Sequence, residues 1–262
     1  MARFEGPEGM VTAAPRARPA GSRRRVVRAP YQEEIVESLA TASGREVVGT
    51  VREWADYVRR ASAHVQEHHG LASYAEAAAR LSGHVKLAGV FVQKVASWRI
   101  DPAWMIVVIR RDGEIGALAI INPRVVERGM YLNDLWTNPR KAYRITEDDR
   151  IPGEDLSGQA MMEYLIRDTY RRGWELELLA GDTIARRWYF TKFGFGVRTP
   201  KRSDPVALAM DYSEHQCVWV NPRLGTTERE MYLPRDRQEE FIERHAGTRA
   251  LIVARTYPAL RD

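Results

Sequence analysis

The chain has 262 residues, of which 44% are hydrophobic and 29% charged, so it can bury a core and is expected to form one domain with additions, or two domains. No apolar run approaches the roughly 18 residues of a membrane-spanning helix, and the N-terminus lacks the apolar segment of a secretory signal. We therefore expect a soluble, cytoplasmic protein, and its single cysteine, Cys217, excludes an internal disulfide.

The formal net charge of +5 comes from one segment. Residues 1–30 hold seven arginines and two glutamates, which leaves the remainder formally neutral. Because this segment is rich in Pro, Gly and Ala and has almost no periodic apolar residues, we predict a disordered basic tail. Such a tail is either a solvated leader or a contact for nucleic acid or an anionic membrane surface.

Residues 45–51 are predicted as a short strand, followed by helices over residues 52–69 and 73–96, where apolar or alanine-rich faces recur at helical spacing. The apolar runs 104–111 and 114–121 are joined by Asp112 and Gly113. This dipeptide predicts a β-hairpin, because both central residues of a type I′ turn need positive φ.

A third strand is predicted from residue 129 to Pro139, because proline cannot donate to a β-ladder. A helix over residues 156–173 closes at Gly173, residues 174–180 form a strand, and Asp182 caps the next helix. Residues 205–212 predict another strand. Beyond them, residues 215–220 and 250–256 are strand-like, and residues 236–247 form a short amphipathic helix.

Local patterns within residues 130–195, together with this order of elements, resemble the GNAT acetyltransferase superfamily. Residues 135–140 (LWTNPR) look like the family's strand end, apolar-x-x-x-Pro-Arg, and residues 158–160 (GQA) look like the end of its loop pattern Q/R-x-x-G-x-G/A. The resemblance implies an α+β fold with a central mixed, mostly antiparallel, twisted sheet and helices on both faces. Residues 31–213 would form the acyltransferase domain, and residues 214–262 an extension that completes the sheet, covers an edge or holds a partner.

The resemblance also implies acetyl-CoA or another acyl-CoA as co-substrate and predicts no metal. Small residues at a helix N-terminus let free amides and the helix dipole stabilise a diphosphate. Asp155 stands where the family prefers Gln or Arg, so Arg140 or a basic neighbour (Lys141, Arg144 or Arg150) would restore positive charge. The residues implied to hold the cofactor are Leu135, Trp136, Thr137, Arg140, Gly158, Gln159 and Ala160.

The family's next helix, N-x-x-A-x-x-x-Y-x-x-x-G-F, carries a tyrosine that protonates the thiolate leaving group. Counting from Asp182 and Ala185 selects Tyr189, whereas counting back from Gly194 selects Phe190, because one extra residue lies between the two. We favour Tyr189 as the catalytic acid with Trp188 in the core, since a helix end absorbs an extra residue more easily than its first turns. The alternative places Phe190 in the site.

Asp134 is the candidate base, because an ammonium group must lose its proton before nitrogen can attack a thioester. A period of two would place Leu132, Asp134 and Trp136 on one face of the strand, and a carboxylate there would have a raised pKa. Equally, Asp134 is a strand-edge residue paired with an arginine. Glu175 and Glu177 are weaker candidates.

Two other functions fit parts of the sequence. Residues 64–68 (HVQEH) match the zinc pattern H-x-x-E-H, but no carboxylate ligand downstream can be assigned, and the match is short. The main alternative to an N-acyltransferase is an inactive GNAT-like binding or effector protein that acts through a macromolecular partner. For the enzyme, the acceptor is an amine whose class the sequence leaves open.

Overall fold

The computed structural model describes residues 31–36, 38–68, 71–97, 104–145, 156–180, 183–197, 211–213, 218–220, 227–228 and 230–245. The predicted tail (residues 1–30), the run 250–256, and the residues Asp155 and Asp182 lie outside this part of the chain. Within it, no helix combines the length and the apolarity needed to cross a bilayer.

A seven-stranded sheet forms the centre of the molecule, in the order β1-β2-β3-β4-β5-β10-β6. Every neighbouring pair is antiparallel except β4 and β5, which are parallel. Its strands are β1 (Gln32–Val36), β2 (Met105–Arg111), β3 (Glu114–Arg124), β4 (Gly129–Thr137), β5 (Glu175–Leu179), β6 (Gly196–Val197) and β10 (Glu230–Leu233). A separate three-stranded sheet contains β7 (Asp211–Ser213), β8 (Val218–Val220) and β9 (Thr227–Glu228).

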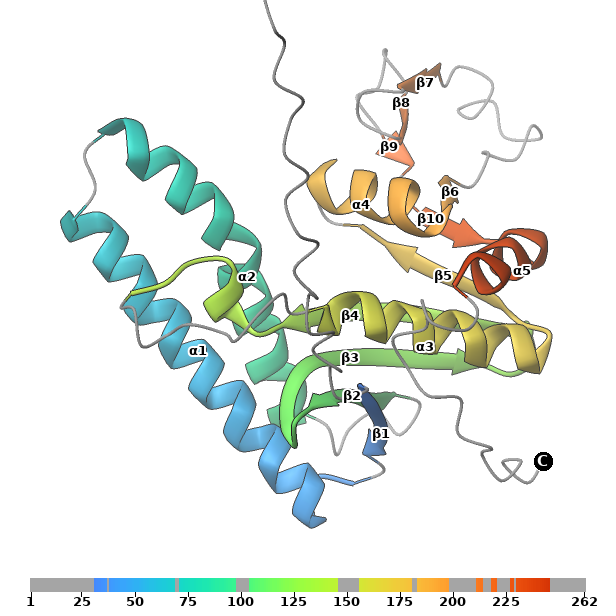
Figure 1. Ribbon diagram of the computed structural model, residues 1–262, viewed down its shortest axis with the longest axis horizontal. Coiled ribbons are helices and arrows are strands. Elements are labelled where there is room, and N and C mark those ends of the chain that lie inside the picture. Colours follow the sequence, from blue (N-terminus) through green and yellow to red (C-terminus); the bar gives the residue numbers. More distant parts are fainter. Residues whose placement is uncertain are drawn as a thin grey trace, which may run out of the picture.

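Helices cover both faces of the seven-stranded sheet (Figure 1). On one face lie α1 (Ala42–His68) and α2 (Leu71–Ser97), a pair of long helices whose core includes Trp54, Phe91 and Trp136. The other face carries α3 (Ser157–Arg172), α4 (Thr183–Phe193) and α5 (Arg235–Arg244), which share a second core with the sheet. A short 3-10 helix, η1 (Pro139–Lys141), follows β4. This architecture confirms the predicted α+β fold.

Local signals placed several elements correctly. Asp112 and Gly113 have φ angles of 54° and 85°, as the predicted hairpin turn between β2 and β3 requires. Gly173 ends α3 in the left-handed conformation, with φ of 70°. The predicted amphipathic helix near the C-terminus is α5.

The strand predicted over residues 45–51 is wrong, because these residues belong to α1. Val47 and Val51 continue one helical stripe with Trp54 and Val58, and all four are buried. Burial of this stripe against α2 and the sheet outweighs the β preference of the valines. The sequence analysis also missed β1, and the last two residues of its strand over 205–212 belong to β7 in the separate small sheet.

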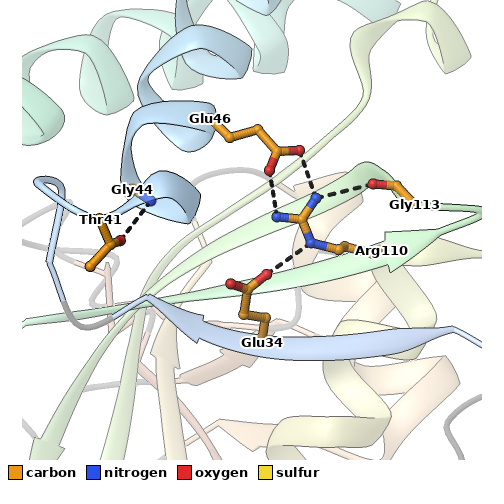
Figure 2. A network of polar contacts seen from close by, with 6 residues as sticks. All are labelled: Glu34, Thr41, Gly44, Glu46, Arg110 and Gly113. Atoms are coloured by element: carbon orange, nitrogen blue, oxygen red, sulfur yellow. Dashed lines mark hydrogen bonds and ion pairs between the residues drawn. The ribbon is translucent and has the colours of Figure 1, made fainter.

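An arginine on β2 ties α1 to the sheet (Figure 2). Arg110 donates to Glu34 on β1 at 2.8 Å and to both carboxylate oxygens of Glu46 on α1 at 2.6 and 2.8 Å. Burial alone would raise the pKa of Glu34, but hydrogen bonds from Ser43 and Arg110 lower it below its ordinary value. The bidentate contact between Arg110 and Glu46 fixes the start of α1 over the edge of the sheet.

Gly116 on β3 sets the position of α3. A Cβ atom at this residue would collide with Oγ of Ser157 and lie 2.8 Å from its Cβ. Ser157 is the first residue of α3 and is fully buried. Only a glycine therefore lets the N-terminus of α3 approach the sheet this closely.

We expect Gly116→Ala to lower the free energy of unfolding by about 1–3 kcal/mol through overpacking. Ser157→Gly in the same chain should recover much of that loss, because it removes the atoms that the new methyl group meets. Urea unfolding of the wild type, both single variants and the double variant gives the coupling energy. Additive effects of the two substitutions would contradict this account of α3.

Candidate functional site

A β-bulge in β4 opens the sheet at its centre. Ile120 pairs with Asp134 and Ile121 pairs with Leu132, so Asn133 is an extra residue without a partner on β3. The pairing of β4 with β5 runs from Gly129 to Leu132 and ends at this bulge. Beyond it, β4 remains paired with β3 as far as Thr137, and no described strand pairs with its other edge.

The bulge also corrects the predicted faces of β4. Leu132 packs in the core under α3, whereas Trp136 packs in the core under α1 and α2. Asp134 reaches Lys94 on α2 and thus lies on the same side as Trp136. Leu132 does not share a face with Asp134 and Trp136, because one inserted residue shifts the alternation.

Two adjoining cavities, which we call the large and the small chamber, lie where β4 and β5 separate. The large chamber has a volume of about 800 Å³ and is lined by α2, the end of β4, η1 and the residue after it, and the first turns of α3 and α4. The small chamber, of about 250 Å³, lies among α2, the bulge, β5 and α4. Both are lined by Gly83, Leu87, Leu135, Ala185 and Tyr189.

Tyr189, and not Phe190, faces the chambers. Tyr189 is 9% exposed and lines both of them, one helical turn after Ala185, whereas Phe190 is 47% exposed and lines a separate surface hollow beside α5. The amide of Phe195 donates to the carbonyl of Tyr189, and Gly194 has a φ of 81°. The helix therefore stays regular through Phe193, and the extra residue is absorbed in the turn that follows.

The N-terminus of α3 opens onto the large chamber through Gly158 and Gln159. A Cβ atom at Gly158 would lie 2.9 Å from Cγ2 of Thr137, so the helix start is packed directly against the end of β4. The N-cap residue, Leu156, makes no side-chain cap, although its own amide donates to the hydroxyl of Tyr31, and the amides of a first helical turn have no partner within the helix. These amides and the helix dipole favour an anion at this point.

Three predicted cofactor residues have side chains outside the chambers. Trp136 is fully buried between Trp54 and Phe91, with ring centroids 5.3 Å from each. Ala160 is fully buried in the core under α3. Arg140 donates to Glu53 on α1 at 3.0 Å, and Lys141 beside it lines the large chamber instead. The predicted site residues that line the chambers are Asp134, Leu135, Thr137, Gly158, Gln159 and Tyr189.

His84, on α2, is a chamber residue that the sequence analysis missed. Burial lowers the pKa of His84 to about 4, with a further contribution from the charge of Lys141. The indole N–H of Trp136 donates to its Nδ1 at 3.1 Å. The imidazole is therefore neutral at pH 7 with its proton on Nε2, where it can donate a hydrogen bond but cannot accept a proton.

Asp134 forms an ion pair with Lys94, a second residue that the sequence analysis missed. Its Oδ2 lies 2.7 Å from Nζ of Lys94, and the two side chains are 16% and 21% exposed. The ammonium also lies 4.2 Å from the ring centroid of Trp104. The partner of Asp134 is thus a lysine from α2 and not an arginine, and the pair joins α2 to the bulged strand.

The other candidates lie elsewhere. Glu177 pairs with Arg124 at 3.2 Å, and neither it nor Glu175 lines a chamber. His64 and His68 stack with ring centroids 4.2 Å apart, and Nδ1 of His64 lies 3.0 Å from the hydroxyl of Tyr143. Among the described residues, no three His, Cys, Asp or Glu side chains gather as a metal site. Trp188, expected in the core, is partly buried and lines the large chamber.

No family model matches the chain, and no curated protein matches it. Several solved structures, however, match the chain. The chain is 14% identical to the ribosomal-protein-S18-alanine N-acetyltransferase of Escherichia coli, with a TM-score of 0.39 over 78% of this chain and 94% of that one. It is 11% identical to the GCN5-related N-acetyltransferase of Rhodopseudomonas palustris, with a TM-score of 0.41 over 79% of this chain and 98% of that one.

A third match is the PaiA N-acetyltransferase of Thermoplasma acidophilum in complex with coenzyme A, at 14% identity and a TM-score of 0.35, over 66% of this chain and 95% of that one. All three of these proteins are N-acetyltransferases.

The lowered pKa of His84 predicts a specific loss of stability in acid. Between pH 6.5 and about 4 the unfolded chain binds a proton at His84 and the folded chain does not, so the free energy of unfolding falls as the pH falls. His84→Gln can still accept from Trp136 but has no such proton to bind. We expect the stability of wild type relative to this variant to decrease by on the order of 2–3 kcal/mol between pH 7 and pH 4. A difference that urea unfolding finds constant with pH would contradict this prediction.

Proposed function

We propose that this protein transfers an acyl group from an acyl-CoA to an amine. The observation that carries the proposal is the meeting of three groups at the gap between β4 and β5: the N-terminus of α3, the phenol of Tyr189 and the carboxylate of Asp134. The first is suited to an anion and the other two to proton transfer. The start of α3 lines the large chamber, Asp134 lines the small one and Tyr189 lines both, beside the point where the pairing of β4 with β5 ends.

The large chamber fits an acyl-CoA in size and in chemistry. Its volume of about 800 Å³ lies in the range of small-molecule sites. Leu135, Leu156 and Trp188 offer apolar walls to a pantetheine arm, and the first turn of α3 offers amides to its phosphates. Lys141 adds positive charge at the same chamber, where the sequence analysis looked to Arg140, whereas Arg80 is paired there with Glu76.

Bound acyl-CoA would supply an activated thioester, and the chain would supply proton transfer and positioning. An ammonium acceptor must lose a proton, which the carboxylate of Asp134 accepts directly or through water. The hydroxyl of Tyr189, which also lines the small chamber, would donate a proton to the departing sulfur. The acceptor amine enters through the small chamber, since the large one is filled by the cofactor.

Calorimetric titration with acetyl-CoA and with CoA tests the cofactor. We expect dissociation constants on the order of micromolar for both ligands, because most of the contacts proposed involve the portion that they share. Absence of heat at millimolar ligand would overturn the proposal. Binding without any acyl transfer to a panel of amines would instead favour a GNAT-like binding protein.

A charge substitution at the start of α3 tests where the phosphates lie. The Thr137→Ser background removes the methyl group that a side chain at residue 158 would meet. In this background, Gly158→Glu should bind CoA about tenfold more weakly than Gly158→Gln, which has the same shape without the charge. The difference should shrink at high salt. Equal affinities would place the phosphates elsewhere.

Replacement of the phenol tests the acid. With any amine that shows activity, Tyr189→Phe should lower the turnover number by about 100-fold and leave the affinity for CoA within a factor of two. Phe190→Tyr is the matched control, because its ring lies on the outer face of the same helix, and it should not change turnover. Unchanged turnover in Tyr189→Phe would remove this residue from the mechanism.

A further inference from the structure

Lysine is scarce in this chain, yet two lysines line the chambers and a third is paired with a chamber residue. The sequence has 40 basic residues, of which only five are lysines. Lys86 lines the small chamber, Lys141 lines the large one, and Lys94 is bonded to Asp134. Arginine serves as the cation almost everywhere else, but it cannot lose its proton in a protein and so cannot act as a nucleophile. Lysine, unlike arginine, provides an amine that can lose its proton and act as a nucleophile.

Among these lysines, Lys94 is the one whose amine contacts the proposed catalytic base. Lys86, Val90 and Lys94 are spaced four residues apart and therefore share one face of α2. The first two line the small chamber, as does Asp134, whereas Lys94 lines neither chamber and is linked to the small one through Asp134. Nζ of Lys94 lies 2.7 Å from Oδ2 of that carboxylate, and 21% of the lysine side chain is exposed. The base proposed for an incoming amine thus already holds an amine of its own chain.

We propose that Lys94 is the first acyl acceptor of this protein, so that the chain acylates itself before, or instead of, an external amine. The inference rests on the proposed acyl-CoA function and names the group that occupies the acceptor position. It also explains why the carboxylate of Asp134, expected to await a substrate, is paired with a residue from α2.

The reaction is a balanced acyl transfer. The ammonium of Lys94 gives one proton to Asp134, and the nitrogen lone pair attacks the carbonyl carbon of the thioester. A carbon–nitrogen bond forms, the carbon–sulfur bond breaks, and the sulfur receives a proton from Tyr189. The nitrogen loses its second proton to Tyr189, directly or through water, which restores the phenol, and Asp134 then releases the first proton to solvent. The products are one amide on Lys94, one CoA thiol and one proton released.

Acylation would change the site that carries it. The amide of an acylated Lys94 has no charge, so the ion pair with Asp134 and the cation–π contact with Trp104 are both lost. Asp134 then faces the small chamber without its cation and can bind the ammonium of an external acceptor. Self-acylation thereby converts a closed acceptor position into an open one.

The test is the intact mass of the full-length protein after incubation with acetyl-CoA in the absence of any added amine. We expect one acetyl group per chain, which peptide mapping assigns to Lys94. Lys94→Arg keeps the positive charge and should lose this acetyl group, whereas Lys192→Arg, on the exposed face of α4, should keep it. Asp134→Asn should slow its appearance by about 100-fold.

Several results would overturn the inference. The first is a wild type that remains unmodified, and the second is equal modification of all exposed lysines. The third is an acetyl group that remains in Lys94→Arg, including the case in which it is lost in Lys86→Arg. Calorimetry on the same samples separates this failure from that of the proposed function: CoA binding without acetylation of Lys94 rejects only the self-acylation, and no CoA binding rejects both.

A measurement without any CoA checks the environment of Lys94 independently. The labelling rate of Lys94 by a small amine-reactive ester, read by mass spectrometry, should change at least about tenfold between wild type and Asp134→Asn if the carboxylate controls the amine. The labelling rate of Lys192 should be the same in both proteins. An unchanged rate at Lys94 would overturn the role given to the pair.

Discussion

The end of hydrogen bonding between β4 and β5 is the constraint on which the site depends. Parallel strands of a sheet normally continue side by side, but here pairing stops at Leu132, where Asn133 is inserted into β4. The strand remains anchored to β3 on its other side, so the sheet opens without coming apart. The two chambers are lined by residues of α2, β4, β5, η1, α3 and α4 and of the segments beside them. A single inserted residue thus turns a continuous sheet into one with a site at its centre.

Buried polar contacts from the bulged strand hold the far wall in place. Beyond the bulge, Asp134 and Trp136 both point toward α2, where they meet Lys94 and His84 at 2.7 and 3.1 Å. These two residues are ten positions apart on α2, so the helix is held to β4 at two points almost three turns apart. The His84 contact requires a neutral imidazole, and the Asp134 contact requires two charges. Acidification would therefore break the contact between His84 and Trp136, and neutralisation of Lys94 would break its contact with Asp134.

Local chemistry predicted the elements, and tertiary packing decided what the sequence left open. The turn at Asp112 and Gly113 and the helix stop at Gly173 follow from backbone preferences that act within a few residues. The helical state of residues 45–51 does not, because their valines suit either structure until α2 and the sheet cover them. The face of Leu132 was misjudged for a related reason: strand alternation holds only without a bulge, and no residue type announces one. His84 and Lys94 were missed because their partners lie 52 and 40 residues away in the chain.

The two aromatic residues at positions 189 and 190 show how one extra residue can leave a site intact. An insertion within α4 would have rotated everything beyond it by about 100° and brought Phe190 to the chambers. The insertion falls instead in the turn, where Gly194 takes a φ of 81° and the helix before it keeps its register. Ala185 and Tyr189 consequently share the chamber face, and Phe190 points outward. Tyr189 and Asp134 thus both line the small chamber, the arrangement on which the proposed acyl transfer depends.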